Sequence, residues 1–457
     1  MLLPILLGFL AALIGGLYLL GVCRQRRPGE PPLDKGLIPW LGHVLEFRRD
    51  TLKFIDRMRQ KHGDVFTIQL AGFYVTFLQD PLSFGSLVKE SREKLDFNKF
   101  AKQLVLRVFG YKAIENDHQI LHLSSNKHLK GDGLEVLTQA MMTNLQNLML
   151  HSIGSAAAQR TWTEDGLFMY SYNIVFRAGY LSLLEAGRLL EYFWDAVSVH
   201  KMKNKDNISR WVWDMQQAKE ENGMKESMIN KYMFVLLWAS QGNTGPSSFW
   251  LLLFLMKHPE AMTAVKEEVD KIVKESGQEV KRGGPLISLT REMLMKTPVL
   301  DSAVEETLRL TAAPLLTRAV IQDMTLKMAD GREVFIRQGD RIAAFPYSAV
   351  HIDPEIHPDP HSFKYDRFLN PDGSKKTDFY KAGKKVKYYN MPWGAGVSMC
   401  PGRFFATNEL KQFVFLMFVY FEFELKNPDE KIPEIDCRRW GFGSMQPVKD
   451  VQFRYRL

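Results

Sequence analysis

The sequence predicts a mainly helical protein with a minor β component, behind one membrane-spanning helix. Residues 1–22 contain no charged side chain, and such a run can cross a hydrocarbon core of ~30 Å. Further helices are predicted over 82–91, 133–155, 163–182, 225–258, 297–310 and 401–421. Two stretches, "DVFTIQLAGFYVTFLQD" and "TLKMADGREVFI", are typical of paired strands with a glycine at the turn.

The order of charges at the amino terminus favours a retained anchor over a cleaved signal peptide. A signal peptide has basic residues before its apolar run, whereas here "RQRR" comes after it. This order places the bulk of the chain on the cytosolic side. We therefore predict an anchor over 1–22 and one domain over 23–457. Three prolines between them predict a stiff, extended connector: Pro28, Pro31 and Pro32.

Composition limits the classes of function. The net charge is +8, yet no long block of like charge occurs, so nucleic-acid binding is disfavoured. A basic surface suits acidic lipid or an acidic protein partner, and a solvated surface without a partner is equally compatible. The chain has 3 cysteines and no C-x-x-C pair, which predicts neither a disulfide framework nor a zinc site.

One of these cysteines lies in a glycine-framed turn, "MPWGAGVSMCPGRFF". Proline is favoured at the first position of a helix, so Pro401 predicts a helix start just after Cys400. Free N–H groups and the helix dipole there stabilise a thiolate, which is the form that binds a metal. Because no second cysteine or histidine is near, the metal must bring its other ligands, as haem does. Gly396 and Gly402 would let the backbone approach a flat macrocycle.

This turn resembles the haem-binding loop of the cytochrome P450 family, F-x-x-G-x-[RH]-x-C-x-G. Gly396, Cys400 and Gly402 match the pattern. The resemblance implies the cytochrome P450 fold, with haem b as cofactor and Cys400 as the axial iron ligand.

Two positions of the loop depart from the family pattern. Trp393 replaces phenylalanine, and it should still pack under the haem. Ser398 replaces the basic residue that pairs with a haem propionate. The resemblance therefore transfers that contact to Arg318, in "APLLTRAV".

Three charged residues upstream complete a second family pattern. Glu306 and Arg309 are three apart and share one helix face, a pairing that on a surface is worth little. The resemblance implies that Arg367, in "KYDRF", joins them in a buried cluster that supports the haem site. Three histidines nearby could instead form a metal site, although loop positions among prolines are the favoured interpretation: His351, His357 and His361.

The run "LLWASQGNTGPSSFW" interrupts the long helix predicted over 225–258. Pro246 has no N–H, so the carbonyl of Gly242 loses its hydrogen-bond donor. The run resembles the family pattern [AG]-G-x-[DE]-T at Gly242 and Thr244, with Asn243 in place of the acid. This implies that Thr244 hydrogen-bonds dioxygen and relays protons, with help from water because Asn243 cannot ionise. The alternative is a packing kink with the threonine bonded inside the helix.

Several longer runs resemble the sterol-hydroxylating members of the family, among them "KTPVLDSAVEETLRL" and "DCRRWGFGSMQPVKDVQFRYRL". They imply hydroxylation of a sterol at carbon 12 in bile-acid synthesis, at the endoplasmic reticulum membrane. The implied partners are a sterol, dioxygen, an NADPH-dependent flavin reductase and membrane lipid. Trp238 is a candidate sterol contact, although core packing is the default for a helical tryptophan. The alternative is an isomerase of the same family that needs no oxygen activation, and Thr244 argues against it.

The segment 184–224 is shorter than its counterpart in the family. That interval holds two long helices, their loop and a short helix, which together form the roof of the substrate pocket. Residues 184–202 predict only one helix of that roof. We expect this chain to lack part of the roof, and so to bind haem but to capture substrate less well. The alternative function is that of a truncated variant that binds haem with little activity.

Overall fold

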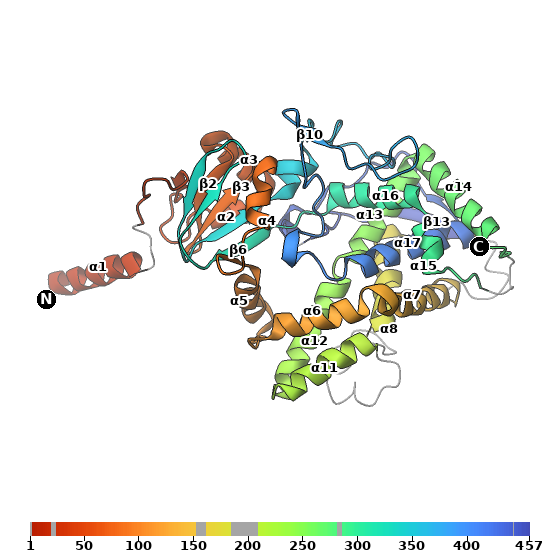
Figure 1. The fold of residues 1–457 in the computed structure, drawn as a ribbon, viewed down its shortest axis with the longest axis horizontal. Coiled ribbons are helices and arrows are strands. Elements are labelled where there is room, and N and C mark those ends of the chain that lie inside the picture. Colours follow the sequence, from red (N-terminus) through yellow and green to blue (C-terminus); the bar gives the residue numbers. More distant parts are fainter. Residues whose placement is uncertain (1, 20–23, 152–160, 184–208, 281–285, 442) are drawn as a thin grey trace.

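The computed structural model describes residues 2–19, 24–151, 161–183, 209–280, 286–441 and 443–457. As predicted, the fold is mainly helical with small sheets (Figure 1). The helices are α1 (Leu2–Leu19), α2 (Val44–Arg49), α3 (Thr51–His62), α4 (Phe84–Val88), α5 (Phe97–Phe109), α6 (Asp117–His128), α7 (Gly131–His151), α8 (Leu167–Leu183), α11 (Arg210–Glu221), α12 (Glu226–Gln241), α13 (Thr244–Lys257), α14 (Pro259–Glu275), α15 (Arg291–Met295), α16 (Pro298–Thr311) and α17 (Arg403–Tyr420).

The strands are β1 (Leu33–Asp34), β2 (Val65–Leu70), β3 (Phe73–Leu78), β4 (Leu95–Asp96), β5 (Thr163–Gly166), β6 (Leu316–Val320), β7 (Met324–Lys327), β8 (Glu333–Ile336), β9 (Arg341–Ala344), β10 (Tyr380–Lys381), β11 (Lys384–Lys385), β12 (Glu422–Leu425) and β13 (Gln452–Arg456). Both predicted strand pairs are confirmed, as the antiparallel hairpins β2–β3 and β7–β8.

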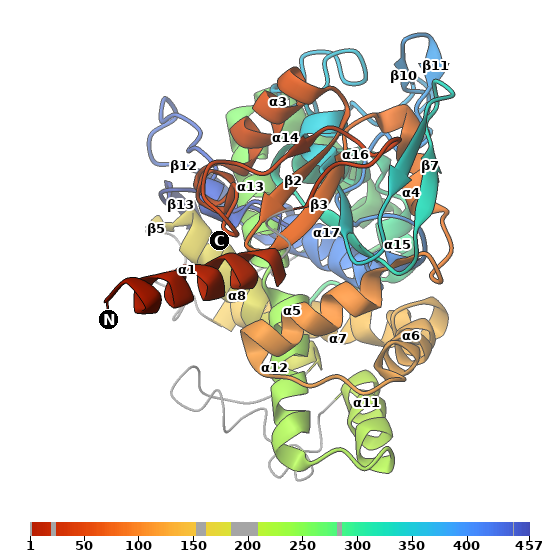
Figure 2. The same ribbon diagram turned by 90° about the vertical axis from the view of Figure 1, so that its left-hand side faces the viewer.

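The largest sheet combines the two ends of the chain. Its strand order is β1-β2-β3-β9-β6-β4, so β6 and β9 from the second half lie beside the amino-terminal hairpin. Helix α3 packs on this sheet through buried Phe54 and Met58, which join Phe66 and Phe77 in one cluster (Figure 2). This arrangement places β6, which carries Arg318, inside the sheet.

The long helix predicted over 225–258 is divided. Helix α12 ends at Gln241 and α13 begins at Thr244, so the break lies at the predicted position. Helix α13 is buried almost throughout and packs against α8. A Cβ on Gly245 would lie 2.4 Å from Cδ2 of Tyr172 on α8, so this helix contact requires a glycine.

The predicted helix over 163–182 starts later than expected. Residues 163–166 form β5, which pairs antiparallel with β13, and α8 begins at Leu167. The partner strand lies almost 300 residues along the chain, so local pattern could not reveal the pairing. The helix predicted within 184–202 lies outside the described residues.

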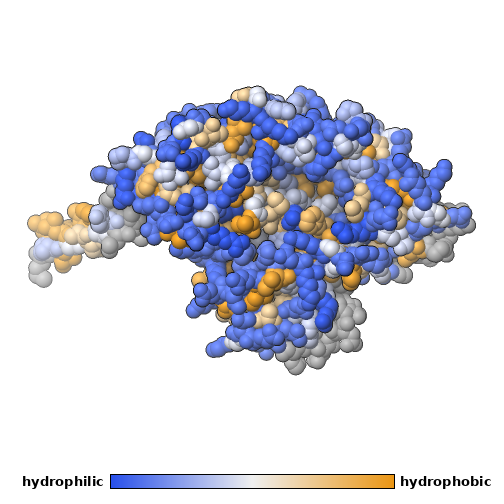
Figure 3. Space-filling model, viewed as in Figure 1, coloured by the Kyte–Doolittle hydropathy of each residue, from blue (hydrophilic) through white to orange (hydrophobic). Residues whose placement is uncertain are grey.

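The amino-terminal helix α1 projects from the body, and its apolar side chains are exposed (Figure 3). Across the described part of the chain, no helix combines the length and apolar content needed to cross a membrane. The predicted transmembrane anchor over 1–22 is therefore not confirmed.

The connector after α1 is held to the body by ion pairs. It is not extended throughout, as its prolines predicted, since Pro28 and Gly29 form a turn in which the N–H of Glu30 donates to the carbonyl of Arg27 at 3.2 Å. Arg24 bonds both Asp340 and Glu30, and Glu30 also accepts from Nε of Arg337 at 2.7 Å. The side chains of Arg24, Glu30 and Asp340 are each less than a tenth exposed. Burial raises the pKa of Asp340 to about 6 despite its contact with Arg24.

Candidate functional site

The cysteine loop runs from Met391 to the start of α17. The backbone N–H of Cys400 donates to the carbonyl of Trp393 at 2.9 Å, and that of Gly394 donates to Met391 at 3.2 Å. Helix α17 begins at Arg403, two residues later than Pro401 predicted. Cys400 is half-buried and forms no disulfide, so its thiol is available as a ligand.

The protonation of Cys400 differs from the sequence-based expectation. Burial raises the pKa of its thiol, and the N–H of Gly402 and the charge of Arg403 oppose that rise without reversing it. The helix start alone therefore does not produce a thiolate. A bound metal ion would, since coordination displaces the thiol proton.

The two loop glycines serve different purposes. Gly396 has φ +66°, and a Cβ there would lie 2.7 Å from the carbonyl oxygen of Val88 on α4. This glycine is therefore required by contact with the chain itself. A Cβ on Gly402 would meet only Sγ of Cys400, at an ordinary 3.9 Å.

Arg318 lies on β6, close to this loop. The neighbouring strand residue Leu316 would lie 3.5 Å from a Cβ on Gly394. Arg318 is 8% exposed, and its guanidinium donates to the carbonyl of Thr317 and lies over the ring of Phe97. Among the described residues no carboxylate forms an ion pair with it. Burial lowers its pKa to about 10, and the charge of Asp96 opposes that fall without reversing it. A buried cation with no carboxylate in contact is costly, so an anionic group such as a haem propionate fits this position.

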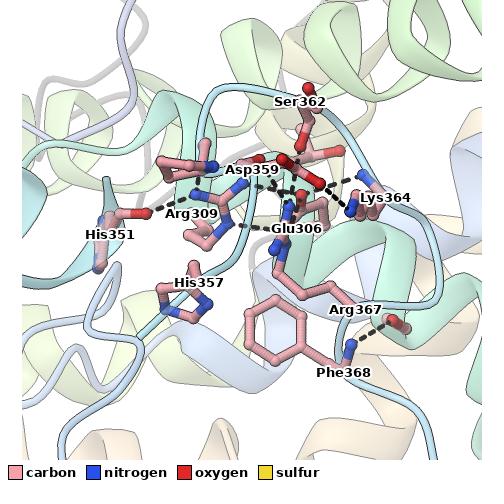
Figure 4. Close-up of polar contacts among 12 residues, drawn as sticks. Glu306, Arg309, His351, His357, Asp359, Ser362, Lys364, Arg367 and Phe368 are labelled. Carbon is pink, nitrogen blue, oxygen red and sulfur yellow. Dashed lines mark hydrogen bonds and ion pairs between the residues drawn. The ribbon is translucent and has the colours of Figure 1, made fainter. Parts of the chain in front are cut away.

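Glu306, Arg309 and Arg367 come together as a buried cluster (Figure 4). Nε of Arg309 and Nε of Arg367 lie 2.7 and 2.9 Å from Oε2 of Glu306. Both guanidinium groups also donate to backbone carbonyls of the 351–362 segment. The cluster thus fixes the chain that leads toward the cysteine loop.

The three nearby histidines do not form a metal site. Within the described ranges, no group of three or more histidine, cysteine or acidic side chains could hold a metal ion. His351 and His357 are fully buried and bond backbone atoms, whereas His361 is exposed.

The helix break places Thr244 beside an acid that the sequence interpretation missed. Glu409 of α17 is fully buried, and burial raises its pKa well above the ordinary carboxyl range, with the Thr244 hydroxyl opposing that rise. In the described chain, neither Glu409 oxygen nor Oγ1 of Thr244 makes a hydrogen bond of normal geometry. A Cβ on Gly179 would lie 2.7 Å from Oε1 of Glu409, so α8 leaves room for this group.

A signal for Glu409 was present in the sequence. It lies four residues from Phe405 and from Phe413, both buried, and therefore shares their helix face. Glu409 lies nine residues after Cys400, on the helix that follows the cysteine. Its contact with Thr244 therefore links that helix to the helix break.

Two further predicted site residues, Asn243 and Trp238, contact residues outside the cysteine loop. Oδ1 of Asn243 accepts from the backbone N–H of Ser444 at 3.0 Å, which ties the break to the segment before β13. Trp238 is 42% exposed, and its ring lies 5.5 Å from that of Phe109 on α5. It is thus neither core nor part of the cysteine loop.

A free cysteine at a helix start, a buried arginine with no ion pair among the described residues and a broken helix with a buried threonine fit the site of a haem-thiolate protein. Residues 187–453 match the family described as Cytochrome P450. The chain belongs to the cytochrome P450 family, and its cofactor is accordingly a haem ligated by a cysteine thiolate.

Similar proteins within this family include 12-alpha-hydroxylases and prostacyclin synthases. The chain is 50% identical to the human 7-alpha-hydroxycholest-4-en-3-one 12-alpha-hydroxylase, over 99% of this chain and 98% of the relative. It is 49% identical to the 5-beta-cholestane-3-alpha,7-alpha-diol 12-alpha-hydroxylase of Sus scrofa, with the same coverage. Human prostacyclin synthase is 44% identical over 94% of this chain and 95% of its own.

The length of these alignments differs from that of the chain. The comparison with the human hydroxylase spans 495 positions, whereas this chain has 457 residues. The relative therefore has residues with no counterpart here.

Proposed function

We propose that this protein is a monooxygenase that hydroxylates a sterol, with 7α-hydroxycholest-4-en-3-one as substrate and its carbon 12 as the site, in bile-acid synthesis. The observation that carries the reaction type is the hydroxyl of Thr244 at the helix break, next to the buried acid Glu409. The substrate class is supported by the two 12-alpha-hydroxylases that are about half identical to this chain.

In this proposal Cys400 would bind the haem iron and Arg318 would hold a propionate. When bound, the haem supplies the iron centre at which dioxygen is reduced. Oγ1 of Thr244 donates a hydrogen bond toward the reacting oxygen, and Glu409 returns a proton to that hydroxyl. Burial raises the pKa of Glu409, which favours the protonated carboxyl that this step needs.

The reaction needs an external source of electrons. One C–H bond and one molecule of dioxygen yield one alcohol and one water when two electrons and two protons are supplied. NADPH supplies them through a flavin reductase. The net charge of +8 favours an acidic docking surface on that partner.

We further propose that α1 inserts into the membrane of the endoplasmic reticulum, with the domain in the cytosol. The support is its exposed apolar surface, which includes Leu3 at 69% and Phe9 at 74% exposure. Alkaline carbonate extraction of membranes checks this. The full chain should stay with the membrane, and deletion of 2–19 should release most of it.

Reconstitution with reductase, NADPH and lipid tests the function. The expected product from 7α-hydroxycholest-4-en-3-one is its 12α-alcohol, identified by mass spectrometry against a standard. Product must require NADPH, dioxygen and reductase together. No sterol product from a preparation with full haem content would contradict the proposal.

The prostacyclin-synthase type of isomerase is distinguished by the same assay. Such an enzyme would convert an endoperoxide without reductase. Turnover of an endoperoxide in the absence of NADPH, with no sterol product, would favour that alternative.

A further inference from the structure

Two fully buried histidines lie between the charge cluster and the cysteine loop. His351 ends the π-helical turn Tyr347–His351, and His357 follows in the loop before Arg367. Figure 4 shows both rings on the Arg309 side of the cluster. Neither has an assigned role in the proposed chemistry.

His351 binds the loop as an acceptor. The backbone N–H of Met391 donates to its Nε2 at 3.0 Å, so Nε2 carries no proton. The carbonyl of the same residue accepts from Nη1 of Arg309. His351 therefore joins the charge cluster directly to the first residue of the cysteine loop.

His357 binds the adjacent residue with the opposite polarity. Its Nε2 lies 2.8 Å from the carbonyl oxygen of Tyr389, so this nitrogen is the donor. The rings of Phe368 and Phe379, with centroids 5.9 and 5.0 Å away, fix the orientation of the imidazole. Phe379 also stacks on Tyr389 at 4.5 Å.

The two bonds hold three consecutive residues, 389–391, at the point where the loop begins. From there the bonds Gly394 to Met391 and Cys400 to Trp393 make the loop a short, internally bonded unit. A shift of residues 389–391 must therefore move Cys400 or break those bonds.

We propose that His351 and His357 are positioning residues: as neutral imidazoles of opposite hydrogen-bond polarity, they set the place of the Cys400 loop relative to the Glu306 cluster. This role rests on Cys400 as the haem ligand and is independent of the sterol proposal. The competing explanation is that both rings only fill space in the core.

Substitutions that keep or remove these two hydrogen bonds distinguish the positioning role from simple filling of space. The amide of glutamine reaches the place of Nε2 and can donate or accept, whereas phenylalanine fills the volume of the ring without doing either. Losing one bond leaves a buried backbone group unpaired, and this shifts an equilibrium by about tenfold or more.

The experiment compares His351→Gln, His351→Phe, His357→Gln and His357→Phe, with His361→Phe as the exposed control. The readout is the ratio of thiolate-ligated to thiol-ligated haem in the reduced carbon-monoxide spectrum, at equal haem content. The glutamine variants and the control should keep the wild-type ratio, and the phenylalanine variants should lower it about tenfold.

Equal behaviour of glutamine and phenylalanine at both positions would overturn the proposal, whether both keep or both lose the thiolate form. If a phenylalanine variant does not fold, the glutamine variant at that position still decides. Loss of the thiolate form there contradicts the proposal, and retention at wild-type level supports it.

Discussion

At the scale of single residues, the pair formed by Thr244 and Glu409 is the most informative feature. Thr244 was expected from the helix break, but its partner lies on another helix and depends on the space left by Gly179. The sequence could indicate that Glu409 lies on the buried face of its helix, but not that this face packs against Thr244 and Gly179.

Replacing Thr244 should separate electron use from product formation. In Thr244→Ala the hydroxyl that passes protons is absent, so product should fall about 100-fold while NADPH oxidation continues. Parallel measurement of sterol alcohol, NADPH and hydrogen peroxide checks this. Thr244→Ser retains the hydroxyl and should keep most of the product yield; equal loss in both variants would argue against a role for Oγ1.

Glu409 should make stability depend on pH in one direction. Its pKa is raised in the folded protein, so between the ordinary carboxyl pKa and that raised value only the folded state keeps the proton. Stability should then fall as pH rises above about 4.5, by up to ~1.4 kcal/mol per pH unit. Glu409→Gln cannot ionise and should lose this decline, which thermal unfolding between pH 5 and 8 measures.

The exposed acid Glu434 is the control for that measurement. Glu434→Gln should leave the wild-type decline in place. A Glu409→Gln profile that parallels wild type would show that the carboxyl is ionised in the folded protein.

At the scale of elements, the helices and strands that depend on neighbouring residues along the chain could be predicted from the sequence. The hairpins β2–β3 and β7–β8 and the interruption before Thr244 follow from alternation, turn glycines and proline chemistry. The strand β5 was missed because "TEDG" is polar and exposed, and it becomes a strand only by pairing with β13. The contact of Arg367 with Glu306, 61 residues apart, came from family resemblance.

The contact between α8 and α13 should be sensitive to one methyl group. Gly245→Ala would place Cβ 2.4 Å from Cδ2 of Tyr172, so the helices must separate. We expect a loss of about 1–3 kcal/mol in stability, measured by chemical unfolding.

The matched control is Gly85, also in a helix. A Cβ there would meet only Tyr388, at 3.9 Å, so Gly85→Ala should be neutral or slightly stabilising. Equal effects of the two substitutions would mean that the close approach of Tyr172 does not limit the packing.

At the scale of the whole molecule, the ion pairs of Arg24 and Glu30 with Asp340 and Arg337 hold the segment 24–30 against the body. The prolines predicted a stiff connector, but the acidic and basic partners from residues 337–340 could not be assigned without the fold.

The shortening predicted over 184–224 should weaken sterol capture. The longer alignment with the human hydroxylase agrees with missing residues but does not locate them. We expect 7α-hydroxycholest-4-en-3-one to bind about tenfold more weakly than to that relative, as judged by the substrate-induced spectral shift. Equal affinities in a side-by-side titration would show that the roof is complete without those residues.

The most direct test of the whole account is the reduced carbon-monoxide difference spectrum of the wild type, Cys400→Ala and Cys437→Ala. The band of thiolate-ligated haem should appear in the wild type and in Cys437→Ala, and it should be lost completely in Cys400→Ala. Persistence of that band in Cys400→Ala, or its absence from haem-loaded wild-type protein, would contradict the account.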